Sequence, residues 1–148
     1  MKKLVALFLV ISLILSFCMP SAWASGAVVG DLTLSQQSYA PSEDGRLYIY
    51  LPVQSGVVDC TLTVYDAFGR VMAQFTRAHL TANVHTFFWD ARPAAGNAAG
   101  YAPDMFVPDG LYTIEALCMS GSEDIRRTAT VNVSVNGETA QPERGLPN

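Results

Sequence analysis

The chain has 148 residues, half of them hydrophobic, and a formal net charge of −4. Its only two lysines lie in the first three residues, so the chain beyond them carries seven arginines against thirteen acidic residues, a charge near −6. Because nucleic acids and anionic membrane surfaces are bound mainly through basic side chains, this composition argues against both as partners.

The N-terminus has the pattern of an export signal. Two lysines precede an uncharged stretch from residue 4 to residue 17, and a small-x-small motif ends at Ala24. The apolar run is shorter than the roughly 20 residues that a membrane-spanning helix needs. We therefore expect a signal peptide over residues 1–24, cleavage between Ala24 and Ser25, and no stable membrane insertion afterwards. The mature protein is then secreted, periplasmic or held at the cell surface; an uncleaved N-terminal anchor is the alternative.

Residues 25–135 predict one all-β domain. Apolar and polar residues alternate in short runs that are separated by Gly, Pro, Asn and Asp, and no helical period is sustained. In chain order, strands are expected over residues 28–34, 47–51, 58–65, 70–77, 84–89, 111–118 and 128–135. Pro52 is expected to end the second strand. About seven short strands indicate an immunoglobulin-like Greek-key β-sandwich, with a small open barrel as the alternative.

Two segments fall outside this pattern. Residues 91–110 form a long connection rich in Ala, Gly and Pro, and such loops are uncommon unless they are functional or disordered. Tyr101, Met105 and Phe106 give this connection apolar surface, so it either folds back onto the sandwich, which we favour, or forms a contact surface. Residues 136–148 contain almost no apolar side chains and predict a flexible C-terminal tail.

Three short motifs resemble the immunoglobulin-like domain of the flagellar hook-capping protein (FlgD) family. They are Tyr65-Asp66-Ala67-Phe68-Gly69-Arg70-Val71, Trp89-Asp90 and Val107-Pro108-Asp109-Gly110-Leu111-Tyr112. The resemblance covers about residues 51–135 and implies the sandwich fold, with structural roles for Asp66, Gly69, Trp89, Asp90, Pro108, Gly110 and Tyr112. The chain has Ala91 where that family usually has a glycine. The export signal argues against the hook-cap role itself, so we expect an accessory domain of this type in a secreted setting.

Each motif residue has a physical reason for its place. Gly69 and Gly110 suit backbone positions that a side chain would strain, and Pro108 presets the turn before the next strand. Trp89 is expected to be a core anchor whose N–H needs a partner, and Asp90 to cap the loop that follows. The hairpin and the Pro-Asp-Gly turn also fit the small bacterial proteinase inhibitors related to BsuPI, whereas the Trp-Asp pair favours the hook-cap type.

Two cysteines remain after signal cleavage. Cys60 and Cys118 both fall on the inward phase of their strands, and these strands are antiparallel neighbours in an immunoglobulin-like order. An exported protein can keep a disulfide, so we predict that the two residues form one. Two buried free thiols are the alternative.

No residue constellation predicts catalysis, a metal or another cofactor. His79 and His85 are the only histidines, and their spacing fits no familiar metal motif. Asp90, Asp104 and Asp109 could converge on calcium, but they lack a calcium-loop spacing, and turn formation or capping explains them better. We therefore expect a protein that is not an enzyme.

Exposed aromatic residues are the remaining candidates for binding. Tyr48 and Tyr50 share one face of their strand, which is either an outer binding patch or part of the core. Together with Tyr101, Met105 and Phe106 they are the predicted partner-binding residues. The sequence thus predicts a secreted, non-catalytic module for adhesion or assembly, with a protein or glycan of the cell surface or medium as partner. The alternative is a secreted proteinase inhibitor that presents the 91–110 loop to a protease cleft.

Overall fold

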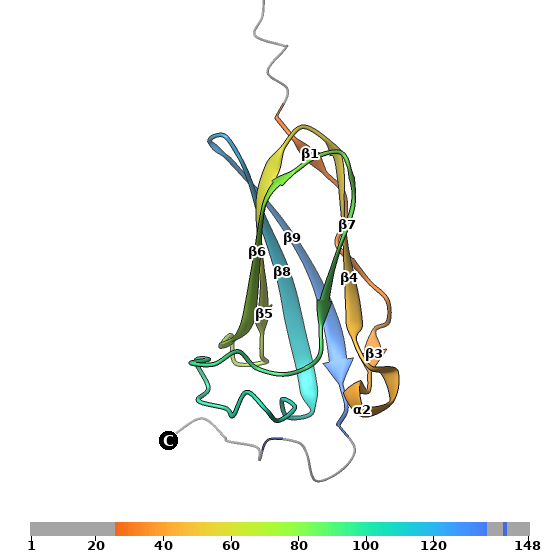
Figure 1. Cartoon of the computed structure of the whole chain (residues 1–148), viewed down its shortest axis with the longest axis vertical. Helices are drawn as coiled ribbons and strands as arrows, with labels where there is room; N and C mark the ends of the chain where they lie inside the picture. The colour runs from red at the N-terminus through yellow and green to blue at the C-terminus, as the bar shows by residue number, and fades with distance from the viewer. Residues whose placement is uncertain (1–25, 136–140, 142–148) are drawn as a thin grey trace, which may run out of the picture.

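The computed structural model describes residues 26–135 and Gln141. Its β-strands form two sheets that pack face to face around one core, so the predicted all-β sandwich is confirmed (Figure 1). The predicted signal peptide, the Ala24–Ser25 cleavage site and the predicted tail, apart from Gln141, lie outside the described residues.

Sheet A is centred on β4 (Leu47–Ser55). One edge of β4 pairs with β7 (Asn83–Trp89), and the other pairs with the short strands β1 (Val28–Val29) and β2 (Thr33–Leu34). All of these pairings are antiparallel.

Sheet B has the order β3-β9-β8-β5-β6. Its strands are β3 (Ser38–Tyr39), β9 (Glu123–Val133), β8 (Gly110–Ser120), β5 (Val58–Tyr65) and β6 (Val71–Leu80), and a short helix, α2 (Pro41–Asp44), follows β3. The chain crosses between the sheets after β2, after β3, after β4, after β6 and again after β7. Together with the β5–β6 and β8–β9 hairpins within sheet B, these crossings give the immunoglobulin-like Greek key.

The structure divides the strand predicted over residues 28–34 into two short strands, β1 and β2. The prediction that Pro52 ends the second strand was also wrong. Pro52 lies inside β4, and its carbonyl accepts a hydrogen bond of 2.8 Å from the Gly30 N–H in the break between β1 and β2. A proline has no N–H for a neighbouring strand, and here that neighbour is interrupted. A side chain on Gly30 would come within 2.8 Å of the proline ring. The break between β1 and β2 therefore lies where Pro52 has no N–H to offer a neighbouring strand.

The core follows the predicted alternation along β5. Its inward side chains are buried and its other positions face outward, except Thr63, which is also buried. Where β7 ends and β8 begins, at the lower end of the sandwich in Figure 1, Trp89 packs on Tyr112 with ring centroids 5.5 Å apart. These large aromatic side chains close the core where the loops begin.

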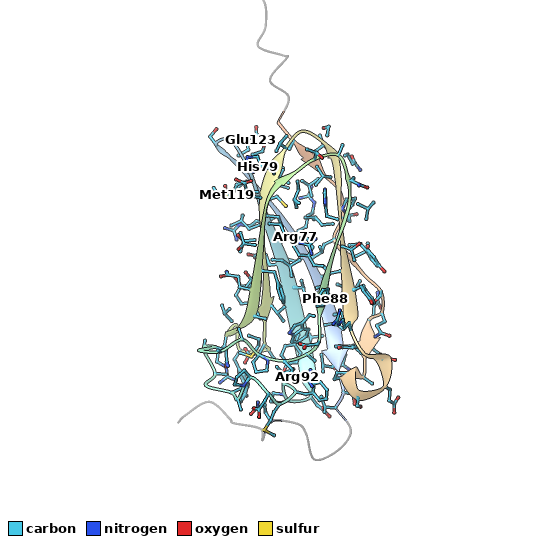
Figure 2. All side chains as sticks on the ribbon, in the orientation of Figure 1. Arg77, His79, Phe88, Arg92, Met119 and Glu123 are labelled. Atoms are coloured by element: carbon cyan, nitrogen blue, oxygen red, sulfur yellow. The ribbon has the colours of Figure 1, made fainter. Side chains whose placement is uncertain are left out.

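Two arginines close the open sides between the sheets. Arg77 on β6 donates a 2.8 Å hydrogen bond to the carbonyl of Thr86 on β7, and its guanidinium lies 4.2 Å from the centroid of the Phe87 ring. Arg77 lies between the two sheets in Figure 2. On the opposite side, Arg127 on β9 donates a 2.8 Å hydrogen bond to the carbonyl of Val29. Each side chain satisfies a carbonyl of the facing sheet.

The long connection begins with a strained residue. Ala91 has a φ of +60° and is fully buried. A left-handed backbone costs a non-glycine residue roughly 1–2 kcal/mol. Glycine would suit this position, and this chain fills it with a buried methyl group.

We predict that Ala91→Gly leaves the free energy of unfolding unchanged or raises it by up to about 1 kcal/mol, because relief of strain exceeds or balances the lost methyl contact. Ala73→Gly is the matched control, since Ala73 is buried in β6 without a positive φ. It should lower stability by about 1 kcal/mol. Urea unfolding of the two variants measures both changes. Equal destabilisation by both substitutions would contradict the assignment of strain to Ala91.

Candidate binding site

Three segments meet at one end of the sandwich. They are the turn between β5 and β6, the 91–110 connection and the turn that leads into β8, and all lie at the lower end in Figure 1. Between them is a hollow of about 240 Å³. Its lining comprises Asp66, Ala67, Phe68, Arg70, Tyr101, Pro108, Asp109, Gly110, Leu111 and Tyr112. The hairpin motif and the Pro-Asp-Gly motif, which are far apart in sequence, therefore share one site.

The first wall is the β5–β6 turn, which is built around the carboxylate of Asp66. One carboxylate oxygen accepts hydrogen bonds from the N–H groups of Phe68 (3.0 Å) and Arg70 (2.8 Å). The other accepts one from the Arg70 Nε at 2.7 Å. Gly69 completes the turn with a φ of +77°. Because the Asp66 carboxylate is buried, these charge-assisted bonds fix both the turn and the arginine.

Arg70 extends from this turn between two aromatic rings. Its guanidinium carbon lies 5.1 Å from the ring centroid of Phe68 and 5.7 Å from that of Tyr101. Its Nη2 donates a 3.3 Å hydrogen bond to the hydroxyl of Tyr101. Phe68 stays 54% exposed, whereas Tyr101 is only 6% exposed. The hollow thus has a fixed cation within it and an accessible ring at its rim.

The second wall, the 91–110 connection, is folded back onto the sandwich, as we favoured from the sequence. The N–H groups of Ala94 and Ala98 donate to carbonyls of β6, at 2.7 and 3.1 Å. The Asn97 side chain donates to the Tyr101 carbonyl at 2.8 Å and accepts from the Tyr101 N–H at 3.0 Å. This part of the connection therefore caps the exposed edge of a strand and holds Tyr101 in the hollow.

The other two predicted partner-binding residues of the connection do not line this hollow. Met105 and Phe106 are half-buried, and Phe106 packs against the core with the Arg92 guanidinium 4.7 Å from its ring centroid. Gln141 is buried against the same stretch, and its N–H donates to the Phe106 carbonyl at 2.9 Å. These contacts give Phe106 a packing role.

The third wall is the turn into β8. The Tyr112 hydroxyl donates a 2.7 Å hydrogen bond to the Pro108 carbonyl, and burial raises the pKa of Tyr112. Gly110 has a φ of +152°, a conformation that disfavours a side chain. One oxygen of Asp109 accepts a hydrogen bond from the Val135 N–H. No residue within the described ranges donates to the other oxygen, which is free to accept from a ligand.

The Trp89-Asp90 motif does not line the hollow. Trp89 is 1% exposed, and its ring N–H donates to the Arg92 carbonyl at 3.0 Å. One carboxylate oxygen of Asp90 accepts from the Arg92 N–H at 3.1 Å, and the other lies 3.2 Å from the Arg92 side chain. Both residues hold the start of the 91–110 connection.

Tyr48 and Tyr50 lie on a different surface, the outer face of sheet A. Tyr48 is 43% exposed and Tyr50 is half-buried. Tyr48 is in register with Phe88 on β7, which is itself 45% exposed, and the Arg46 guanidinium lies 4.3 Å from the Phe88 ring centroid. The predicted partner-binding residues are therefore divided between this outer face and the loop end.

Cys60 and Cys118 lie directly opposite each other on β5 and β8. They are a register pair, and both side chains are fully buried. The structure holds them as free thiols. A hydrogen bond with Cys118, together with burial, raises the pKa of the Cys60 thiol. Neither sulfur is accessible to a substrate.

The histidines and loop acids form no shared site. His79 is exposed, and its main-chain N–H donates to Asp59, while the His85 ring bonds the Thr81 carbonyl. Within the described part of the chain, no three His, Cys, Asp or Glu residues are grouped as metal ligands would be. None of the helices among these residues is long and apolar enough to span a membrane.

The hollow itself was not predicted from the sequence. Asp66, Gly110 and Tyr112 were predicted to have structural roles, and no role was predicted for Asn97. The signal that was available is the polar Asp-x-x-x-Arg spacing in a tight turn, which brings the two charged groups together. Among known proteins, no family model matches the chain and no curated protein shows significant similarity to it.

We predict that Asp66→Asn lowers the free energy of unfolding by about 1.5–3 kcal/mol, because an amide NH₂ then faces the Arg70 Nε donor in a buried place. Asp124→Asn is the control, since Asp124 is exposed at the far end of the sandwich. Urea unfolding measures both variants. A loss below about 0.5 kcal/mol for Asp66→Asn would contradict its central role in the turn.

Proposed function

We propose that this chain is an exported, non-catalytic binding module that holds a partner protein or glycan through the loop end of its sandwich. The observation behind this proposal is the hollow in which Arg70 is fixed between two rings while Phe68 is left 54% exposed. Aromatic and arginine side chains are enriched at protein interfaces. The module would act in adhesion or assembly, in the cell envelope or outside the cell.

The rigidity of the site supports binding. Asp66 fixes the first wall, Asn97 fixes Tyr101 in the second, and the Tyr112 hydroxyl fixes the third. A wall that is ordered before the ligand arrives loses little conformational entropy on binding. A passive spacer has no need of such an arrangement.

No observation favours the proteinase-inhibitor alternative. A loop that enters a protease cleft projects from its scaffold in an extended conformation, whereas residues 94–101 turn back and bond to β6. A hollow can also take up a ligand, whereas an inhibitor needs a protruding segment that enters the protease.

A capture experiment tests the proposed function. The exported protein, immobilised, is incubated with native envelope and culture-medium fractions, and its retention of partners is compared with that of Phe68→Ala. Phe88→Ala is the matched control, because Phe88 is similarly exposed and also lies beside an arginine, but on the other sheet. Figure 2 shows it on β7, and it does not line the hollow.

We expect a specific partner that the wild type and Phe88→Ala retain and that Phe68→Ala retains at least fivefold less, as loss of about 1 kcal/mol implies. Point variants are preferable to deletion of the 91–110 connection, which would uncover the edge of β6. Equal retention by all three proteins, or none by any, would exclude the loop end as the binding surface.

We also propose that Cys60 and Cys118 form a disulfide once the protein is exported. Their register pairing on antiparallel strands suits the Cα separations that disulfides need. Oxidation would release two protons and pass two electrons to a disulfide-bonded oxidant of an exported compartment. The bond would link neighbouring strands at the centre of sheet B.

Protein isolated from the medium or periplasm should therefore be 2 Da lighter than the dithiol form and resist alkylation in denaturant until a reductant is added. Reduction should lower its free energy of unfolding by up to about 4 kcal/mol. Denaturant is essential here, because buried thiols also react slowly in the folded state. Alkylation of both cysteines without a reductant would show that they stay free.

A further inference from the structure

We infer that the hollow at the loop end binds one neutral sugar ring, a pyranose unit of a glycan. This inference rests on the proposed binding function and names the class of ligand. It follows from the charges, the free hydrogen-bonding groups and the apolar rim of the hollow.

The charges of the hollow favour a neutral ligand. Its charged lining groups are Arg70, Asp66 and Asp109. Arg70 and Asp66 form an ion pair with 2.7 Å between Nε and the carboxylate. An anionic ligand near Arg70 would also meet Asp66 and Asp109, and a cationic one near Asp109 would meet Arg70. A charged ligand of either sign would therefore meet both an attractive and a repulsive charge in the hollow.

The free hydrogen-bonding groups are both donors and acceptors. Arg70 Nη1 donates to no residue in the described ranges, and the Tyr101 hydroxyl accepts from Arg70 while its own proton is left to donate. The free oxygen of Asp109 can only accept. A hydroxyl group donates and accepts at once, so neighbouring hydroxyls on one ring can satisfy all three groups.

The rim supplies an apolar surface beside these groups. Phe68 is 54% and Leu111 is 52% exposed, and both line the hollow. The C–H face of a pyranose ring is apolar and can pack on them while its hydroxyls face the polar groups. The volume of about 240 Å³ lies below the range of roughly 300–1,000 Å³ for drug-sized ligands. It therefore suits a single ring.

The test is titration of the full exported protein with neutral methyl hexosides, namely those of glucose, galactose and mannose. Glucuronate and glucosamine serve as charged comparators. Binding is followed by calorimetry and by NMR shifts of the hollow's amide groups. We expect at least one neutral glycoside to bind with a dissociation constant of about 1 mM or tighter, and more tightly than its charged relatives.

Three variants assign that binding to the hollow. Phe68→Ala should weaken it about three- to tenfold, by removing the ring contact. Asp109→Asn keeps an oxygen for the Val135 N–H but replaces the free acceptor by a donor, and it should weaken binding by a similar factor. Phe88→Ala should leave the affinity unchanged. Thermal unfolding shows whether each variant is still folded, so that a loss of affinity is not mistaken for a loss of structure.

The inference is overturned if no neutral glycoside binds, if a charged comparator binds more tightly, or if Phe88→Ala weakens binding as much as Phe68→Ala. These outcomes remain separate from the capture experiment. A partner captured through Phe68 that no glycoside displaces would leave the binding function standing and exclude the sugar. Displacement of that partner by a neutral glycoside would support both.

Discussion

The loop end of this sandwich depends on one buried carboxylate. Asp66 accepts two main-chain hydrogen bonds within its own turn and one from the Arg70 side chain. Buried charge is costly unless it is paired and bonded, so the turn and the arginine must be in place together. Arg70 then reaches Tyr101, which belongs to a loop thirty-one residues away in sequence. A local turn motif thereby determines where a distant aromatic side chain lies.

The 91–110 connection is held in place by hydrogen bonds to β6, the edge strand of sheet B. An edge strand exposes main-chain groups that can pair with other chains, and Ala94 and Ala98 cover two of these carbonyls. In return, the turns that cover the edge bring Asn97 close enough to hold Tyr101 by both its main-chain groups. Protection of the edge and formation of the hollow are thus consequences of the same packing. This explains how a segment rich in Ala and Gly can be a fixed part of a site.

Prediction from the sequence was good where it rested on the alternation within a strand or on the strand order of the fold. Alternation along β5 identified its inward residues, and the order of the strands brought Cys60 opposite Cys118. Pro52 was misjudged because the effect of a missing N–H depends on the neighbouring strand, which is broken at that point. The hollow could not be predicted because it, too, depends on segments that are distant in sequence. Its walls come from three separate segments: the register of β5 with β8 brings Phe68 near Asp109, and the packing of the 91–110 connection on β6 adds Tyr101.

Arginine is used to the exclusion of lysine after the first three residues, and the structure explains this choice. Each of the six arginines in the described ranges contacts a ring, a carboxylate or a carbonyl of the domain. Arg77 stacks on Phe87 while it bonds the Thr86 carbonyl, and a planar guanidinium can do both where a lysine ammonium cannot. Arg70 combines a carboxylate and two rings in the same way. The positive charge of the domain is thus engaged in its own structure, on a chain whose net charge is negative. A surface of this kind has little electrostatic attraction for an anionic polymer, whereas a neutral ligand that binds through hydroxyl groups and ring contacts needs none.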